Sequence, residues 1–188
     1  MSETGSHNAR LRACQPRDLD RLHEINCGST PGVSEETKAS LDDILAHSDC
    51  LVVGSDAGRS DGWFEADGFI TLIEPGTLAY KSENLRWFER WQAATGHSLI
   101  YVDRIAIHAD KRGNALGHVL YKRTFEAYSD REFIGAEVNT LPDNPGSHRF
   151  HQRLGFHRVG EQTFSENKAV AYYVRELAQA PQRSAGQS

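Results

Sequence analysis

The stretch that most constrains the fold is an apolar run followed by a turn of small and charged residues and then an amphipathic segment. Residues 98–107 (SLIYVDRIAI) predict a strand, and residues 116–129 (LGHVLYKRTFEAYS) carry apolar side chains at helical spacing. The turn between them, RGNALG at 112–117, would aim the partnerless amides of a helix N-terminus at one point, where an anion could bind. By itself this turn fits a phosphate site and a plain loop about equally, because short glycine motifs recur without function.

Strand-like and helix-like patterns follow one another along the rest of the chain. Expected strands cover residues 9–14, 50–55, 67–74, 132–140, 156–164 and 168–177. Expected helices cover residues 15–26, 35–48 with Ser34 as N-cap, 147–155, and a segment that begins near Ser82. This order predicts a mixed α/β fold of the α+β kind. Residues 9–177 are expected to form a single domain, with residues 1–8 and 178–188 as flexible tails.

Composition narrows the class of protein. The 188 residues carry 26 acidic and 21 basic side chains, a formal net charge of −5, so a nucleic-acid footprint over the whole surface is not expected. Cys14, Cys27 and Cys50 are widely spaced and the nine histidines form no H-x-x-x-H or Cys/His cluster, so we expect neither a disulfide framework nor a metal site. No stretch has the length of a membrane span or the core of a signal peptide. We therefore expect a cytoplasmic protein with no nucleic-acid or membrane partner.

Two motifs in the right order indicate a family. The turn RGNALG resembles the R/Q-x-x-G-x-G/A acyl-CoA signature of the GNAT N-acetyltransferase superfamily, which also follows an apolar strand and precedes a helix. Residues 137–156 (EVNTLPDNPGSHRFHQRLGF) resemble the strand, Asn-containing loop, helix and Leu-Gly-Phe ending of that family. YVDRI, EVN and NPGS are most similar to a group of bacterial predicted acetyltransferases. The resemblance implies a GNAT-like, mostly antiparallel central sheet flanked by helices.

The same resemblance implies acetyl-CoA, or coenzyme A after transfer, as co-substrate. The backbone of Ile105, Ala106 and Ile107 would pair with the pantetheine arm. Backbone amides of the turn and the helix start would hold the pyrophosphate, namely those of Arg112, Gly113, Asn114, Ala115, Leu116, Gly117 and His118. Asn144 resembles an asparagine that contacts coenzyme A, with Asn139 as second choice and loop capping as the plain alternative.

Ala115 departs from the family pattern, which has its first glycine at this position. Alanine adds one methyl group beside the expected pyrophosphate. It is the smallest such change and is not expected to need a positive φ, so coenzyme binding should survive.

Amine acetylation requires a base, because an alkylammonium with a pKa near ~10 must lose a proton before it can attack. Glu137 is the leading candidate, since the resembling ribosomal-protein N-terminal acetyltransferases carry a catalytic glutamate at this strand position. Its plain alternative is an ion pair with Arg104 or Arg149. Asp103 is the second candidate, with a salt bridge to an adjacent basic residue as its alternative. Glu74 could also reach a substrate, although EPG fits a strand exit equally well.

The acid that protonates the departing thiolate is commonly a tyrosine in this family, at the position of His151. A neutral histidine must first be protonated to donate, whereas tyrosine donates at any ordinary pH. His151 is therefore the candidate acid, with a solvent-facing or coenzyme-contacting histidine as the alternative and Tyr121 or Tyr172 as substitutes.

These assignments predict direct transfer of an acetyl group from acetyl-CoA to a primary amine of a small molecule or peptide. The acidic surface favours a cationic acceptor such as a polyamine, an aminoglycoside or a peptide amine. A non-catalytic acyl-CoA sensor or interaction module is the rival reading. A nucleotide-phosphate binder is disfavoured, because the P-loop Lys-Ser/Thr and the G-x-G-x-x-G pattern are both missing. The segment with Trp87 and Trp91 would cover the sheet, wall the acceptor pocket or form a homodimer surface.

Overall fold

One seven-stranded sheet organises the protein, for which a computed structural model describes residues 9–55 and 63–177. The strand order is β1-β2-β3-β4-β5-β7-β6, and every neighbouring pair is antiparallel except β4 and β5. The strands are β1 (Ala9–Ala13), β2 (Asp49–Ser55), β3 (Gly68–Ile73), β4 (Leu99–Ile107), β5 (Phe133–Leu141), β6 (His157–Ser165) and β7 (Lys168–Glu176). The mixed, mostly antiparallel sheet expected from the sequence is confirmed.

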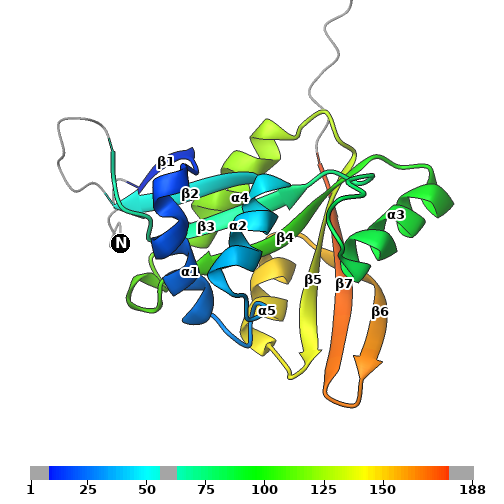
Figure 1. The fold of residues 1–188 in the computed structure, drawn as a ribbon. Helices are drawn as coiled ribbons and strands as arrows, with labels where there is room; N and C mark the ends of the chain where they lie inside the picture. Colours follow the sequence, from blue (N-terminus) through cyan, green and yellow to red (C-terminus); the bar gives the residue numbers. More distant parts are fainter. Residues whose placement is uncertain (1–8, 56–62, 178–188) are drawn as a thin grey trace, which may run out of the picture.

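Five helices cover the two faces of this sheet (Figure 1). They are α1 (Leu19–Cys27), α2 (Lys38–Ala46), α3 (Glu83–Thr95), α4 (Leu116–Ala127) and α5 (Pro145–Arg153), with short 3-10 turns η1 (Pro16–Asp18) and η2 (Ala109–Lys111). The expected tails and the linker 56–62 lie outside the described residues. None of the helices within the described ranges combines the length and apolar character that a membrane crossing needs.

Alternation along the strands assigns the helices to faces, because successive side chains of a strand point to opposite sides. Val53, Ile70 and Val102 pack in one cluster with apolar side chains of α4 and α5. Their sequence neighbours point the other way: Val52 and Phe69 pack with α1 and α2. On the same side, Tyr101 and Tyr172 pack against α3. Helices α4 and α5 therefore cover one face, and α1, α2 and α3 share the other.

The start of α2 differs from the prediction. Its N-cap is Thr37, whose hydroxyl accepts a hydrogen bond from the amide of Ser40 at 3.1 Å, and not Ser34. The segment before it is held by side chains of α1: the amide of Asn26 donates to the carbonyl of Ser34 at 3.0 Å, and a ring nitrogen of His23 lies 2.9 Å from the carbonyl of Glu36. These carbonyls are used by another helix, so the segment stays out of α2.

Helix α3 lies unusually close to the sheet, because two glycines face its aromatic side chains. A Cβ on Gly135 would come within 2.5 Å of the Phe88 ring, and one on Gly160 within 2.4 Å of the Trp87 ring. Trp87 stacks on Tyr172 with ring centroids 3.9 Å apart. The expectation that this segment covers the sheet is confirmed.

We predict that Gly160→Ala lowers the free energy of unfolding by about 1–3 kcal/mol, because the added methyl overlaps Trp87 and the helix must shift. Gly146→Ala is the matched control, since its Cβ would make only an ordinary contact at 3.8 Å and the stability should stay within about 0.5 kcal/mol. Urea unfolding measures both. Equal stability of the two variants would show that α3 does not need the space above Gly160.

Candidate active site

The site begins where β4 and β5 part. Their parallel pairing runs from Leu99 and Phe133 to Val102 and Ala136 and then stops, while β4 stays paired with β3 as far as Ile107. A bulge lies at this point, because Thr71 and Leu72 of β3 face Arg104 and Val102 and leave Asp103 as the extra residue. Beyond Val102, one edge of β4 therefore has no strand partner, and Asp103 and Glu137 are the first residues past the parting.

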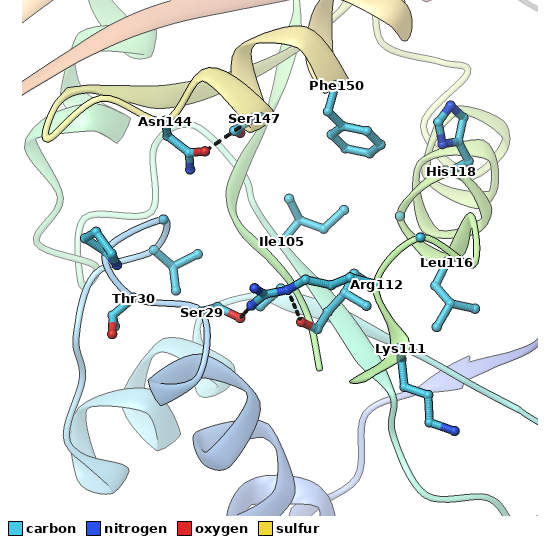
Figure 2. A pocket seen from close by; sticks show the side chains of 18 of the residues that line it. Ser29, Thr30, Ile105, Lys111, Arg112, Leu116, His118, Asn144, Ser147 and Phe150 are labelled. Atoms are coloured by element: carbon cyan, nitrogen blue, oxygen red, sulfur yellow. Dashed lines mark hydrogen bonds between the residues drawn. The ribbon is translucent and has the colours of Figure 1, made fainter. Parts of the chain in front are cut away.

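A cleft of about 790 Å³ lies along this free edge (Figure 2). All residues predicted to contact coenzyme A line it except Asn114 and the second choice, Asn139; the side-chain amide of Asn114 instead donates to the carbonyl of Lys111 at 3.2 Å. The cleft also has a wall that the sequence did not indicate, formed by residues 29–33 after α1 and by Ser147, Phe150 and Arg153 of α5. No motif marks residues 29–33, because they meet the turn only through the fold, whereas the α5 residues lie within the second motif but were assigned no role there.

The turn before α4 has the backbone shape that an anion site requires. The first bond of this helix runs from the amide of Val119 to the carbonyl of Ala115, so the amides of residues 116–118 have no intrahelical acceptor. Gly113 has φ 82° and Ala115 has φ 58°. The expectation that Ala115 needs no positive φ is wrong. The left-handed conformation costs a residue with a Cβ about 1–2 kcal/mol, and the turn keeps its shape in spite of this cost.

Arg112 ties the turn to the opposite wall of the cleft. Its guanidinium donates to the carbonyl of Gly28 at 2.9 Å and to the hydroxyl of Ser29 at 3.2 Å, and its Nε donates to the carbonyl of Ile107 at 3.1 Å. Figure 2 shows this side chain lying between Ser29 and Ile105. Arg112 thus joins the end of β4, the turn and the end of α1.

A second, narrower cavity of about 70 Å³ adjoins the cleft and shares Gly32, Val33, Ile105 and Ser147 with it. The three predicted catalytic residues, Asp103, Glu137 and His151, all line this cavity. The fold thus brings together residues that are up to 48 positions apart, next to the predicted coenzyme cleft.

The two carboxyl oxygens of Glu137 are held differently. Oε1 accepts a hydrogen bond from Nδ2 of Asn84 at 2.9 Å, whereas Oε2 is buried and has no well-formed hydrogen bond. The buried hydroxyl of Tyr101, which also lacks a well-formed bond, acts on this carboxyl group as a donor and lowers its pKa against the larger effect of burial. Burial, with the negative charge of Asp103 as a further cause, raises the pKa of Glu137 to about 8. Within the described ranges no basic side chain forms an ion pair with it, so neither alternative partner from the sequence, Arg104 or Arg149, is used.

Asp103 shows the salt bridge named as its alternative. Its Oδ2 accepts from Nε of Arg104 at 2.8 Å, and its Oδ1 accepts from the hydroxyl of Tyr80 at 2.5 Å. Arg104 is itself buried and contacts Asn26 and Glu36. Both oxygens of Asp103 are therefore held by protein donors, and its negative charge acts on Glu137.

His151 is buried, with 2% of its surface exposed, and so is neither solvent-facing nor a free donor. Nδ1 lies 2.9 Å from the carbonyl of Ser147, which can only accept, so Nδ1 carries the proton. Nε2 then accepts from the hydroxyl of Tyr121 at 2.8 Å. Burial lowers the pKa of His151 to about 4, so the ring is neutral at ordinary pH. The arrangement favours His151 as the partner that orients Tyr121.

The remaining candidates, Asn144, Asn139 and Glu74, each have a hydrogen bond or ion pair elsewhere in the protein. Asn144 lines the cleft, but its side chain caps α5 by accepting from the amide of Ser147 at 3.1 Å. Asn139 donates to the carbonyl of Pro31 at 2.6 Å. Glu74 pairs with Arg131 at 2.9 Å, beyond the end of β3 that is remote from Ile107, so it lies away from the two cavities.

Comparison with known proteins agrees with this geometry. A model of the acetyltransferase (GNAT) family matches residues 61–156, just over half of the chain, and the chain therefore belongs to this family. Among curated protein sequences none matches. The fold is similar to that of several solved acetyltransferases at low sequence identity.

Three of these structures illustrate the similarity. The ribosomal-protein-S18-alanine N-acetyltransferase from Escherichia coli has a TM-score of 0.65 at 10% identity, covering 93% of this chain and 97% of that one. NAA60 of Arabidopsis thaliana, solved with acetyl-CoA, has a TM-score of 0.66 at 18% identity, covering 90% and 99%. A phosphinothricin acetyltransferase from Sinorhizobium meliloti, solved with AcCoA, has a TM-score of 0.62 at 16% identity, covering 92% and 90%.

We predict opposite effects from exchanging the two small residues of the turn. Ala115→Gly should raise the free energy of unfolding by about 1 kcal/mol by relieving the left-handed alanine, and Gly113→Ala should lower it by a similar amount. Gly113 has open space around a Cβ, so its effect is conformational and not a clash. Urea unfolding of both variants checks this, and a change of the same sign in both would contradict it.

Proposed function

We propose that this protein transfers an acetyl group from acetyl-CoA directly to a primary amine, with residues 9–177 acting as one catalytic domain. The observation that carries the proposal is that Glu137, a buried carboxyl group with no ion-pair partner within the described residues, lines the cavity next to the predicted coenzyme cleft, where β4 and β5 part. Membership of the acetyltransferase family and the acetyl-CoA complexes of similar folds support it.

In this proposal the pantetheine arm lies along the free edge of β4 beside Ile105, Ala106 and Ile107, as in a strand addition. The amides from Arg112 to His118 and the dipole of α4 hold the pyrophosphate. Asn114 contributes through its backbone alone, and Asn144 through the edge of the cleft that it lines. This arrangement would point the thioester at the narrower cavity.

Glu137 is the proposed base. Its Oε2 takes one proton from the substrate ammonium, and the amine lone pair then attacks the thioester carbon. The carbon–sulfur bond breaks with its electron pair on sulfur. The proton that the new amide nitrogen loses ends on that sulfur, and Glu137 returns its own proton to solvent.

Tyr121 is proposed to face the departing sulfur, because it lines the cavity and its hydroxyl is oriented by His151. The expected acid, His151, enters this scheme as the residue that orients Tyr121. Its ring is neutral, and its only N–H proton, on Nδ1, is donated to the carbonyl of Ser147, so it has no proton to give to sulfur. Asp103 supplies charge that keeps the pKa of Glu137 high. A small-molecule or peptide amine that reaches Oε2 is the proposed acceptor.

We predict that acetyl-CoA and coenzyme A raise the melting temperature, whereas ATP and NAD do not. A ligand at about 100 times its dissociation constant stabilises the native state by about 2.7 kcal/mol. Thermal shift and calorimetric titration measure this. Thiol release from acetyl-CoA is then followed with a panel of a polyamine, an aminoglycoside, free amino acids and peptides with free N-termini. Binding without turnover on a broad panel would favour the sensor, and no binding at millimolar coenzyme A would remove the transferase proposal.

We predict that kcat/KM for the acceptor rises with pH through about 8, because Glu137 must lose its own proton before it can accept one. In Glu137→Gln this limb should disappear and kcat should fall by about 10²–10⁴-fold, with acetyl-CoA affinity unchanged. Steady-state kinetics and calorimetry test both parts. A variant with the full rate and an unaltered pH profile would eliminate Glu137 as the base.

A further inference from the structure

Helix α3 places a side chain on Glu137 that neither sequence motif contains. Asn84, in the first turn of α3, donates from Nδ2 to Oε1 of Glu137 at 2.9 Å. At its other end, Oδ1 accepts from the hydroxyl of Tyr172 at 2.9 Å. Glu137 and Tyr172 are direct cross-strand partners on β5 and β7. Asn84 therefore bridges two neighbouring residues of the sheet.

The chemistry of the three groups fixes the direction of this bridge. An ionised carboxylate can only accept, so Asn84 must present its amide N–H to Glu137, and its oxygen is left for the tyrosine hydroxyl. When Glu137 is neutral, Oε1 still accepts as the carbonyl oxygen. The proton then resides on Oε2, the oxygen that has no well-formed hydrogen bond.

The close docking of α3 makes this contact possible. Asn84 lies one helical turn before Phe88, and Glu137 lies two residues after Gly135 on the same face of β5. Phe88 occupies the space that a side chain at Gly135 would fill. The same near approach of helix and strand therefore brings Asn84 to the carboxyl group.

We propose that Asn84 is a positioning residue of the active site, holding Oε1 of Glu137 so that Oε2 is the oxygen that exchanges a proton with the acceptor amine. This inference rests on the proposed function, in which Glu137 is the base. It assigns to α3 a part in catalysis besides covering the sheet.

The hydrogen bond from the Asn84 side chain also favours the ionised form of Glu137, because a donor to a carboxylate stabilises its charge. Its loss should raise the pKa of Glu137 further above the ordinary value. Other titratable or charged groups around this carboxyl come from β4, β7, α4, α5 and the segment before α3, namely Tyr80, Tyr101, Asp103, Arg104, Tyr121, His151, Lys168 and Tyr172. Of these groups only Tyr172 is hydrogen-bonded to Asn84, so replacing Asn84 leaves the contacts of the others in place.

Asn84→Asp is the decisive variant, because it keeps the size and shape of the side chain and replaces the donor with an acceptor. We expect kcat/KM near pH 7 to fall by about 10–100-fold, with the rising limb of the pH profile moved upward by about one unit or more. Asn84→Ala should also lower kcat/KM. Because it places no second negative charge beside Glu137, it should move the rising limb of the pH profile by a smaller amount than Asn84→Asp. Asn167→Ala, in the turn between β6 and β7, is the matched control and should leave both quantities unchanged.

The rate is measured with the best acceptor of the amine panel, and the carboxyl pKa of Glu137 is measured directly by NMR on protein labelled with ¹³C at glutamate. Tyr172→Phe keeps the ring on Trp87 and removes only the hydroxyl that holds Asn84. It should shift the limb in the same direction by a smaller amount. This variant tests the bridge even where Asn84→Asp folds poorly.

Two outcomes overturn the inference. An Asn84→Asp variant with the rate and pH limb of Asn167→Ala would show that the contact has no role. An equal loss of rate in Asn84→Asp and Asn84→Ala with the carboxyl pKa unmoved would reduce Asn84 to a packing residue. The Glu137→Gln variant distinguishes failure of the inference from failure of the proposed function. If Glu137→Gln is fully active, Glu137 is not the base. If Glu137→Gln is inactive and Asn84→Asp behaves normally, only the inference about Asn84 is removed.

Discussion

The parallel pairing of β4 with β5 stops after Val102 and Ala136, although each strand continues beside its other neighbour. Backbone N–H and C=O groups inside a sheet cost free energy when they lack hydrogen-bond partners. Where two central strands part, these groups therefore need partners from outside the sheet or from solvent. The bulge at Asp103 and the cleft along Ile105 to Ile107 follow from this one interruption. At this parting Glu137 of β5, which is held by Asn84 of α3, and His151 of α5 line one cavity, although α3 and α5 cover opposite faces of the sheet.

Charge is distributed unevenly around this opening. Asp103 and Arg104 satisfy each other, and Arg104 is further held by Asn26 and Glu36. The neighbouring carboxyl of Glu137 has no ion-pair partner within the described residues, so the hydrogen bond from Asn84 and the effects of Tyr101 and Arg104 compensate its burial only in part. The two acids each follow the last paired residue of their strand and yet differ in character: Asp103 is a fixed charge, and Glu137 can exchange a proton.

The fold, and most of the residues that line the cleft along β4, could be predicted because local patterns carry them. Alternating strands, the helix cap at Ser82 and the RGNALG turn each leave a mark within a few residues. The conformation of Ala115 was missed, since a residue of small size does not reveal the sign of its φ. The start of α2 was missed because side chains of α1 bind the preceding carbonyls, a contact that no local pattern contains.

The lining of the narrower cavity, where the proposed catalytic residues lie, was predicted only in part, for a related reason. Glu137, Asp103 and His151 were found by likeness to a family, but their protonation depends on neighbours that the fold supplies. Tyr121 reaches His151 across 30 positions, and Asn84 reaches Glu137 across 53. Nothing in the sequence around His151 predicts a neutral ring, because burial and the carbonyl of Ser147 produce it.

The high pKa of Glu137 has a consequence for the hydrolysis of bound acetyl-CoA. On the proposed mechanism the free enzyme near neutral pH holds a protonated acid, which cannot activate a water molecule against a bound acyl group. An ammonium entering beside Oε2 favours the ionised carboxyl through its positive charge, so the acceptor itself creates the base that it needs. The buried carboxyl would thereby discriminate between an amine and water by charge, and protect acetyl-CoA from hydrolysis until a cationic substrate arrives.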